Sequence, residues 1–144
     1  MKIKNFYKLI FIIFICTEVF SQEIEFEASK MDIKDNGNII FAYNSKAIIP
    51  LEKIEITSNK AKHNKETEVT IFTDNVIFKD KINNVIIESN RIIYNKIKNL
   101  IYSNDATYMV VKDKYKINSR NVYFDRNLNR IFSNEKTSIE DNDQ

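Results

Sequence analysis

The chain has 144 residues, of which 22 are Lys or Arg and 20 are Asp or Glu, giving a formal net charge of +2 at pH 7. A single Gly excludes a glycine-rich phosphate-binding loop, and a single Cys excludes a framework of internal disulfides. Because the opposite charges nearly balance, the composition does not indicate the clustered basic face with which proteins bind nucleic acids.

The first 21 residues are predicted to be a secretory signal peptide. Three lysines precede the apolar run Leu9–Ile15, and Val19 and Ser21 have the spacing of a signal-peptidase site. Their removal leaves 19 basic and 19 acidic residues and no cysteine. We therefore expect a neutral exported domain over residues 22–144. An uncleaved membrane anchor and a lipoprotein modified at Cys16 are the alternatives.

The rest of the chain contains a repeat of about thirty residues that consists of two arms. In the first arm Ser58, Ser89 and Ser119 are 31 and 30 positions apart, and in the second arm Thr73, Ser103 and Ser133 are 30 apart. Copies of the first arm are Phe26–Lys34, Ile56–Asn64, Ile87–Asn95 and Ile117–Asp125, and copies of the second arm are Phe41–Asn44, Ile71–Phe78, Ile101–Tyr108 and Ile131–Glu135.

Within each arm apolar residues alternate with polar ones, as in Ile54 and Ile56 or Val122 and Phe124. Alternation with a period of two, carried by β-branched and aromatic residues, predicts strands with one buried face. From Ile56 to Ala61 the phase slips by one residue, and we expect a bulge or bend there because an odd step would otherwise turn the side chains to the wrong face. Asn and Asp at such a corner tolerate a left-handed backbone.

Short polar segments separate the runs and are predicted to be hairpin turns. The fold class expected from strands and turns alone is all-β: an antiparallel, repeat-built sheet, or two sheets, closing over a continuous apolar interior. The predicted turns are Asp35–Asn38, His63–Glu66, Lys81–Asn84, Lys96–Asn99 and Arg126–Asn129.

The pair of arms resembles the repeat of the OstA-like lipopolysaccharide-assembly family, which includes the bridge protein LptA and the N-terminal periplasmic domain of the translocon LptD. Ile87–Asn95 is similar to the first half of that repeat and Phe72–Phe78 to the second. The glycine usual in the second half is replaced here by Asp74, Asn104 and Asn134. The resemblance covers about residues 24–140.

The resemblance implies an antiparallel β-jellyroll in the Gram-negative periplasm, associated with the outer membrane. It implies that the partners are lipopolysaccharide, other jellyrolls bound head to tail, and outer-membrane assembly proteins. We expect the chain to be the N-terminal jellyroll of an LptD-type protein, truncated at its C-terminus. The alternatives are a free-standing LptA-type bridge protein and a structural exported β-repeat scaffold.

The lipid-binding groove is predicted from the inward members of the alternation. In the other interpretation the same side chains pack on one another as an ordinary core. The predicted groove residues are Ile56, Ile71, Phe78, Ile87, Ile101, Tyr108, Ile117 and Phe124.

No catalytic group, metal site or cofactor is predicted. The single histidine, His63, takes the position that Tyr94 and Phe124 hold in other copies, where a structural role is the usual one. The acidic residues are scattered, without the spacing of metal ligands, and no serine or cysteine has the context of a nucleophile elbow. The sequence therefore predicts a binding protein that is not an enzyme.

Overall fold

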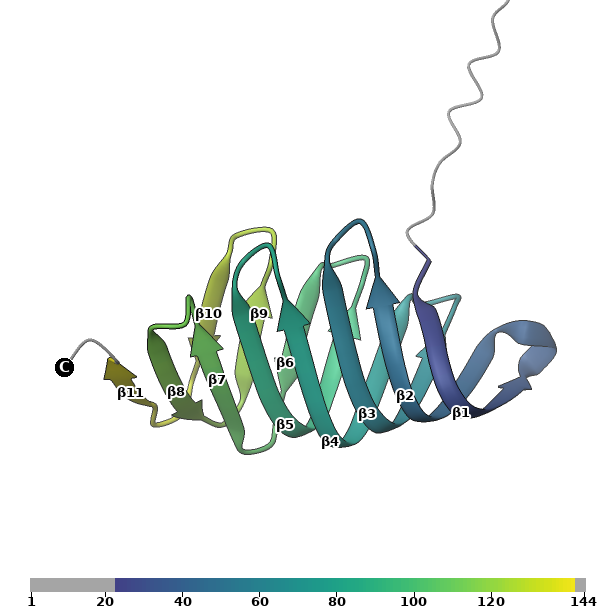
Figure 1. The fold of residues 1–144 in the computed structure, drawn as a ribbon, viewed down its shortest axis with the longest axis horizontal. Coiled ribbons are helices and arrows are strands. Elements are labelled where there is room, and N and C mark those ends of the chain that lie inside the picture. Colours follow the sequence, from purple (N-terminus) through teal and green to yellow (C-terminus); the bar gives the residue numbers. More distant parts are fainter. Residues whose placement is uncertain (1–22, 142–144) are drawn as a thin grey trace, which may run out of the picture.

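The computed structural model describes residues 23–141, so the predicted signal peptide lies outside the described residues. The described chain is built almost entirely of strands, with one short 3-10 helix (η1) after the first strand (Figure 1). The elements are β1 (Glu25–Lys34), η1 (Asp35–Gly37), β2 (Ile39–Ile49), β3 (Ile54–Asn64), β4 (Val69–Asp80), β5 (Val85–Asn95), β6 (Leu100–Ser103), β7 (Thr107–Val111), β8 (Tyr115–Ser119), β9 (Val122–Asp125), β10 (Arg130–Ser133) and β11 (Ser138–Asp141).

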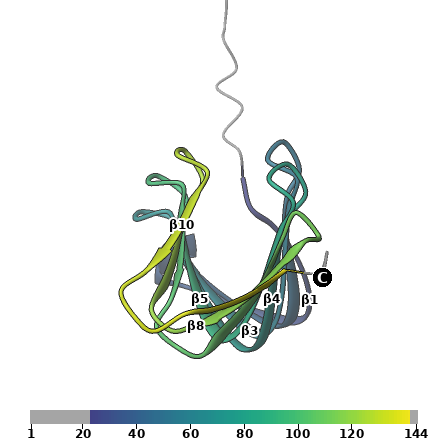
Figure 2. The ribbon, with the colours of Figure 1, turned by 90° about the vertical axis from the view of Figure 1, so that its left-hand side faces the viewer.

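All the strands belong to one antiparallel sheet, which is folded lengthwise into a trough (Figure 2). Strands β2 to β5 each run from one rim through the corner to the other rim. Further along the chain each long strand is replaced by two short strands that meet at the corner. These pairs are β6 with β7, β8 with β9, and β10 with β11. We call the side that ends at turns 50–53, 81–84 and 112–114 wall A, and the side that ends at turns 35–38, 65–68, 96–99 and 126–129 wall B.

The strands turn the corner because residues there drop out of the ladder. Between their paired positions, β5 has the single extra residue Asn90, whereas β4 has two, Asp74 and Asn75. Asp74 and Asn75 have φ values of 65° and 56°, and Asn44 in β2 has 46°. Asn and Asp are the non-glycine residues that most readily adopt this left-handed conformation, so the predicted use of these residues at the corners is confirmed.

Hydroxyl groups of serine residues line the inside of the corner, where most of them are buried. Ser45 and Ser58 are joined through their Oγ atoms at 3.2 Å. The Oγ atoms of Ser89 and Ser103 lie 2.8 Å apart, and Ser119 donates to Ser133 at 3.0 Å in the next repeat. The serines that mark the repeat in the sequence therefore form hydrogen bonds with one another between neighbouring strands.

The turns along each rim are bonded to one another in series. The backbone N–H of Lys96 donates to the carbonyl of Glu68 at 3.0 Å, and that of Arg126 donates to Asn99 at 3.1 Å. On the rim of wall A the N–H of Lys112 donates to Asn84 at 2.8 Å. The accepting residues have positive φ, which ends each turn and directs its carbonyl toward the next one.

The predicted fold class is confirmed: the described chain is an antiparallel β-jellyroll formed by one folded sheet. Four predicted turns agree with the structure in both bounds: Asp35–Asn38, Lys81–Asn84, Lys96–Asn99 and Arg126–Asn129. The turn predicted at His63–Glu66 begins two residues later, because His63 and Asn64 continue β3.

Candidate functional site

The interior of the trough is lined by apolar side chains from both walls. Six of the eight residues predicted for the groove face this interior. Ile56, Phe78, Ile87, Ile101 and Phe124 are each exposed by 2% or less, and Ile117 is partly buried against the same cluster.

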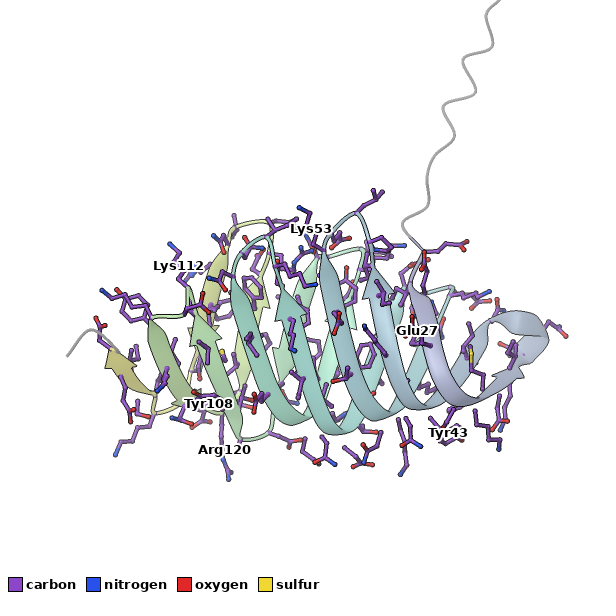
Figure 3. All side chains as sticks on the ribbon, in the orientation of Figure 1. Glu27, Tyr43, Lys53, Tyr108, Lys112 and Arg120 are labelled. Carbon is purple, nitrogen blue, oxygen red and sulfur yellow. The ribbon has the colours of Figure 1, made fainter. Side chains whose placement is uncertain are left out.

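Ile71 and Tyr108 do not face the interior, and their prediction as groove residues is wrong. Ile71 is paired with Lys62 and Ile93 on the outside of wall B. Tyr108 lies between Glu88 and Asn118 on the outside of wall A, close to the corner (Figure 3).

The inward positions are held instead by the next residues along the chain, Phe72 and Met109, which are 0% and 1% exposed. The physical reason is the number of residues at the corner. The two extra residues of β4 preserve the phase from Phe72 to Phe78, whereas the single extra residue of β5 shifts it between Ile87 and Ile92. Expecting the same one-residue slip in both arms therefore places Ile71 and Tyr108, which belong to the second arm, on the inner face of the sheet instead of the outer face.

The centre of the trough is tightly filled. Phe78 from wall A and Phe124 from wall B meet edge to face with ring centroids 6.4 Å apart, and Tyr94 beside them has no exposed surface. A gap lined by Ile87, Ile101 and their neighbours is too narrow to admit a water molecule. In this region the side chains of the two walls pack as in an ordinary β-sandwich.

Both ends of the trough are open. At the end formed by β1, a hollow of about 280 Å³ has Ile24, Phe26, Met31 and Ile40 as its apolar lining, with charged side chains at its edge. At the other end a hollow of about 140 Å³ is lined mainly by apolar residues. We call these the N-terminal and C-terminal mouths. The inward-facing apolar lining of the C-terminal mouth is provided by Met109, Ile117, Val122, Ile131 and Ile139.

A buried ionic cluster, which we call the strap, joins the two walls above the filled centre. Arg126, in a turn of wall B, donates from Nε to Asp80 of wall A at 2.7 Å and from Nη1 to Glu52, also on wall A. Nη1 also donates to Asn99 at 2.6 Å, and the hydroxyl of Tyr94 donates to Glu52 at 3.3 Å. The side chains of Arg126 and Asp80 are only 6% and 0% exposed.

The strap shifts the titration of its members in the directions expected for a paired buried cluster. Burial alone would raise the pKa of Asp80, but hydrogen bonds from Arg126 and Asn83 outweigh it and hold that pKa below the ordinary 3.8. Burial, together with the nearby charge of Glu52, raises the pKa of Tyr94. At neutral pH Asp80 is thus an ionised carboxylate beside the guanidinium of Arg126, and the phenol of Tyr94 is neutral.

His63 lies at the N-terminal mouth, in the inward row that continues to Tyr94, Ile101 and Phe124. Its Nδ1 is 2.9 Å from the hydroxyl of Thr70, and its ring contacts that of Phe26 at a centroid distance of 6.0 Å. Burial lowers its pKa below 6.5, against the opposing charge of Glu68. The ring therefore remains neutral at pH 7 and fills space in the core.

Within residues 23–141 no three His, Cys, Asp or Glu side chains are grouped so that they could hold a metal ion. The same part of the chain contains no helix long and apolar enough to cross a membrane.

No protein-family model matches the chain, and no curated protein matches it in sequence. Among solved structures, the chain is similar to the crystal structure of LptH from Pseudomonas aeruginosa, described as the LptA-homologous periplasmic component of the conserved lipopolysaccharide transport device. The TM-score is 0.71 at 11% sequence identity, and the match covers 83% of this chain and 94% of that one. The described residues therefore have the same fold as LptH, an antiparallel β-jellyroll.

Proposed function

We propose that this chain is a periplasmic component of a lipopolysaccharide transport system, and that it carries lipid acyl chains in its trough without catalysing a reaction. The observation that carries the proposal is a jellyroll of the LptH type whose apolar interior opens at both ends. Each acyl methylene removed from water contributes roughly 0.8 kcal/mol. A chain that buries about ten of them would gain on the order of 8 kcal/mol before the cost of ordering.

The tightly filled centre, taken alone, also suits a structural scaffold in which repeats only extend the sheet. The mouths favour lipid binding, because a scaffold has no need to leave apolar side chains such as Ile139, 63% exposed, uncovered. Lipid capture distinguishes the two functions.

Photo-crosslinking tests the proposal at two neighbouring residues of β8. A photoreactive phenylalanine analogue in place of Ile117, which lines the C-terminal mouth, is expected to capture lipopolysaccharide. The same analogue in place of Asn118, which is paired with Tyr108 on the outer face, is not. Equal labelling at both positions, read on an immunoblot for lipopolysaccharide, would count against the proposal.

Within this role we propose that the chain is the N-terminal periplasmic domain of an LptD-type translocon associated with the outer membrane. A free-standing LptA-type bridge protein is the alternative. The gene sequence beyond the codon for Gln144 separates them, since a translocon continues into a long membrane domain and a bridge protein does not.

We also propose that further jellyrolls bind head to tail at the two ends of the trough. Among the described strands, β1 pairs only with β2, while β10 pairs only with β9 and β11 only with β8. The free edge of β1 spans both walls, as β10 and β11 do together at the opposite end (Figure 1). Strand addition would satisfy these edges.

An aspartate in place of Ile33, which is 64% exposed on β1, is expected to weaken head-to-tail association at least tenfold, because a charge would be buried at the junction. Ile97, in a rim turn and 72% exposed, provides the matched control, and Ile97→Asp is expected to associate like the unaltered protein. Sedimentation velocity over a range of concentrations measures both. Equal weakening by the two substitutions would exclude the end of the trough as the junction.

A further inference from the structure

The open mouths and the filled centre divide the interior of the trough into separate compartments. An alkyl chain entering the N-terminal mouth meets Phe72, Phe78 and Tyr94, which have no exposed surface. Sheets packed face to face with interdigitating side chains leave no room between them for a further chain. Passage from one mouth to the other therefore requires the walls to separate at the centre.

The strap is the polar connection that opposes this separation. It joins residues that are 46 and 74 positions apart in the chain, Arg126 to Asp80 and Arg126 to Glu52. The ladder bonds of the sheet connect neighbouring strands within each wall, and the rim bonds connect successive turns on one side. Neither set holds wall A against wall B at the rims.

The position of the strap allows it to open without leaving buried charges that lack hydrogen-bond partners. Its charged members lie in rim turns and at the end of β4, so they can be hydrated once the walls part. Asp80 keeps three local donors on its own wall, the backbone N–H groups of Ile82 and Asn83 and the side-chain amide of Asn83. Only the bonds that cross between the walls need to be exchanged for bonds to water.

We infer that the strap is a gate that divides the trough into two cargo compartments. Acyl chains rest in the mouths while Arg126 holds Glu52 and Asp80, and they pass the centre when Arg126 releases these carboxylates. The inference rests on the proposed lipid-carrying function.

Tryptophan reporters in the full chain test the gate, because the sequence contains no native Trp. The indole of the Phe26→Trp variant reports on the N-terminal mouth, and that of the Phe78→Trp variant reports on the centre. The probe is a dibromostearic acid, whose bromine atoms quench an indole only on contact. With the strap intact, the mouth indole is expected to be quenched and the central one protected.

Adding Glu52→Gln removes one charge from the strap and is expected to raise the quenching constant of the central indole about tenfold, as the loss of a charged hydrogen bond would. Quenching at the mouth is expected to stay unchanged. Glu55→Gln is the matched control: Glu55 also lies on wall A, and its ion pair with Lys46 runs along the outer face of that wall only. This substitution is expected to leave the centre protected.

Hydrogen exchange provides a second measurement that needs no reporter in the core. In Glu52→Gln alone, the amides of turns 50–53 and 126–129 are expected to exchange faster than in Glu55→Gln. Central quenching with the strap intact, or protection that persists in Glu52→Gln while the mouth is quenched, would overturn the gate and leave lipid binding standing. Absence of quenching at both the mouth and the centre would instead refute the lipid-carrying function, and the gate with it.

Discussion

Arg126→Gln is expected to lower the free energy of unfolding by about 3–5 kcal/mol, because it removes the cation from a buried cluster and leaves its carboxylates without their partner. Arg126 is 6% exposed and contacts Asp80, Glu52 and Asn99. Urea denaturation followed by circular dichroism measures the change. Lys96→Gln, which breaks a more exposed ion pair with Glu68 on one rim, serves as the control and is expected to cost about 1 kcal/mol or less.

The same comparison has a dependence on pH whose sign follows from Asp80. The pKa of its carboxyl is held below 3.8 in the folded protein, so the stabilisation is complete above pH 3.8 and is lost as the pH falls through the lowered value. The difference in stability between the unaltered protein and Arg126→Gln should therefore shrink in acid. A difference that stays constant below pH 3.8 would assign the effect to lost packing of the guanidinium.

Phe72→Ala is expected to destabilise the fold by about 3–5 kcal/mol, because it leaves a cavity in a core that cannot easily collapse. Phe72 has no exposed surface and faces the interior between Ala61 and Ile92. The matched control on the same wall is Phe132→Ala: Phe132 lies on the outside of β10, stacks on Tyr123 and is 37% exposed. Its loss is expected to cost about 1 kcal/mol.

The urea midpoints of the two phenylalanine variants also test whether Phe72, rather than Ile71, is the residue of β4 that faces the interior. If Ile71 rather than Phe72 were the inward residue, Phe72→Ala would behave like Phe132→Ala. Thermal unfolding provides the same comparison, with a much larger fall in the melting temperature expected for Phe72→Ala.

Much of the fold is predictable from the sequence because the repeat is local. Ser58, Ser89 and Ser119 mark equivalent corners, and the odd steps from Ile56 to Ala61 and from Ile87 to Ile92 predict correctly which residues are buried in β3 and β5. Alternation with a period of two depends only on the pleat of a strand, so it survives even in a composition rich in Ile, Asn and Lys.

The errors arise where spacing alone does not determine the backbone. Nothing in the segment around Asp74 and Asn75 indicates whether one or two residues leave the ladder, and that number decides whether Ile71 or Phe72 faces inward. The strap could not be predicted from the sequence pattern for a different reason. Glu52 and Arg126 come together only because the walls fold toward each other. The angle between the two walls is not encoded in the spacing of apolar and polar residues along the chain.

The serial bonding of the rim turns implies that the length of this molecule can change in units. Successive turns on each rim are bonded to one another, as Asn84 is to Lys112, and each thirty-residue repeat adds one hairpin. Duplication or loss of one repeat would lengthen or shorten the molecule by two strand spacings, about 9.5 Å, while leaving every remaining neighbour in place. A protein built in this way can change its length by gene duplication alone.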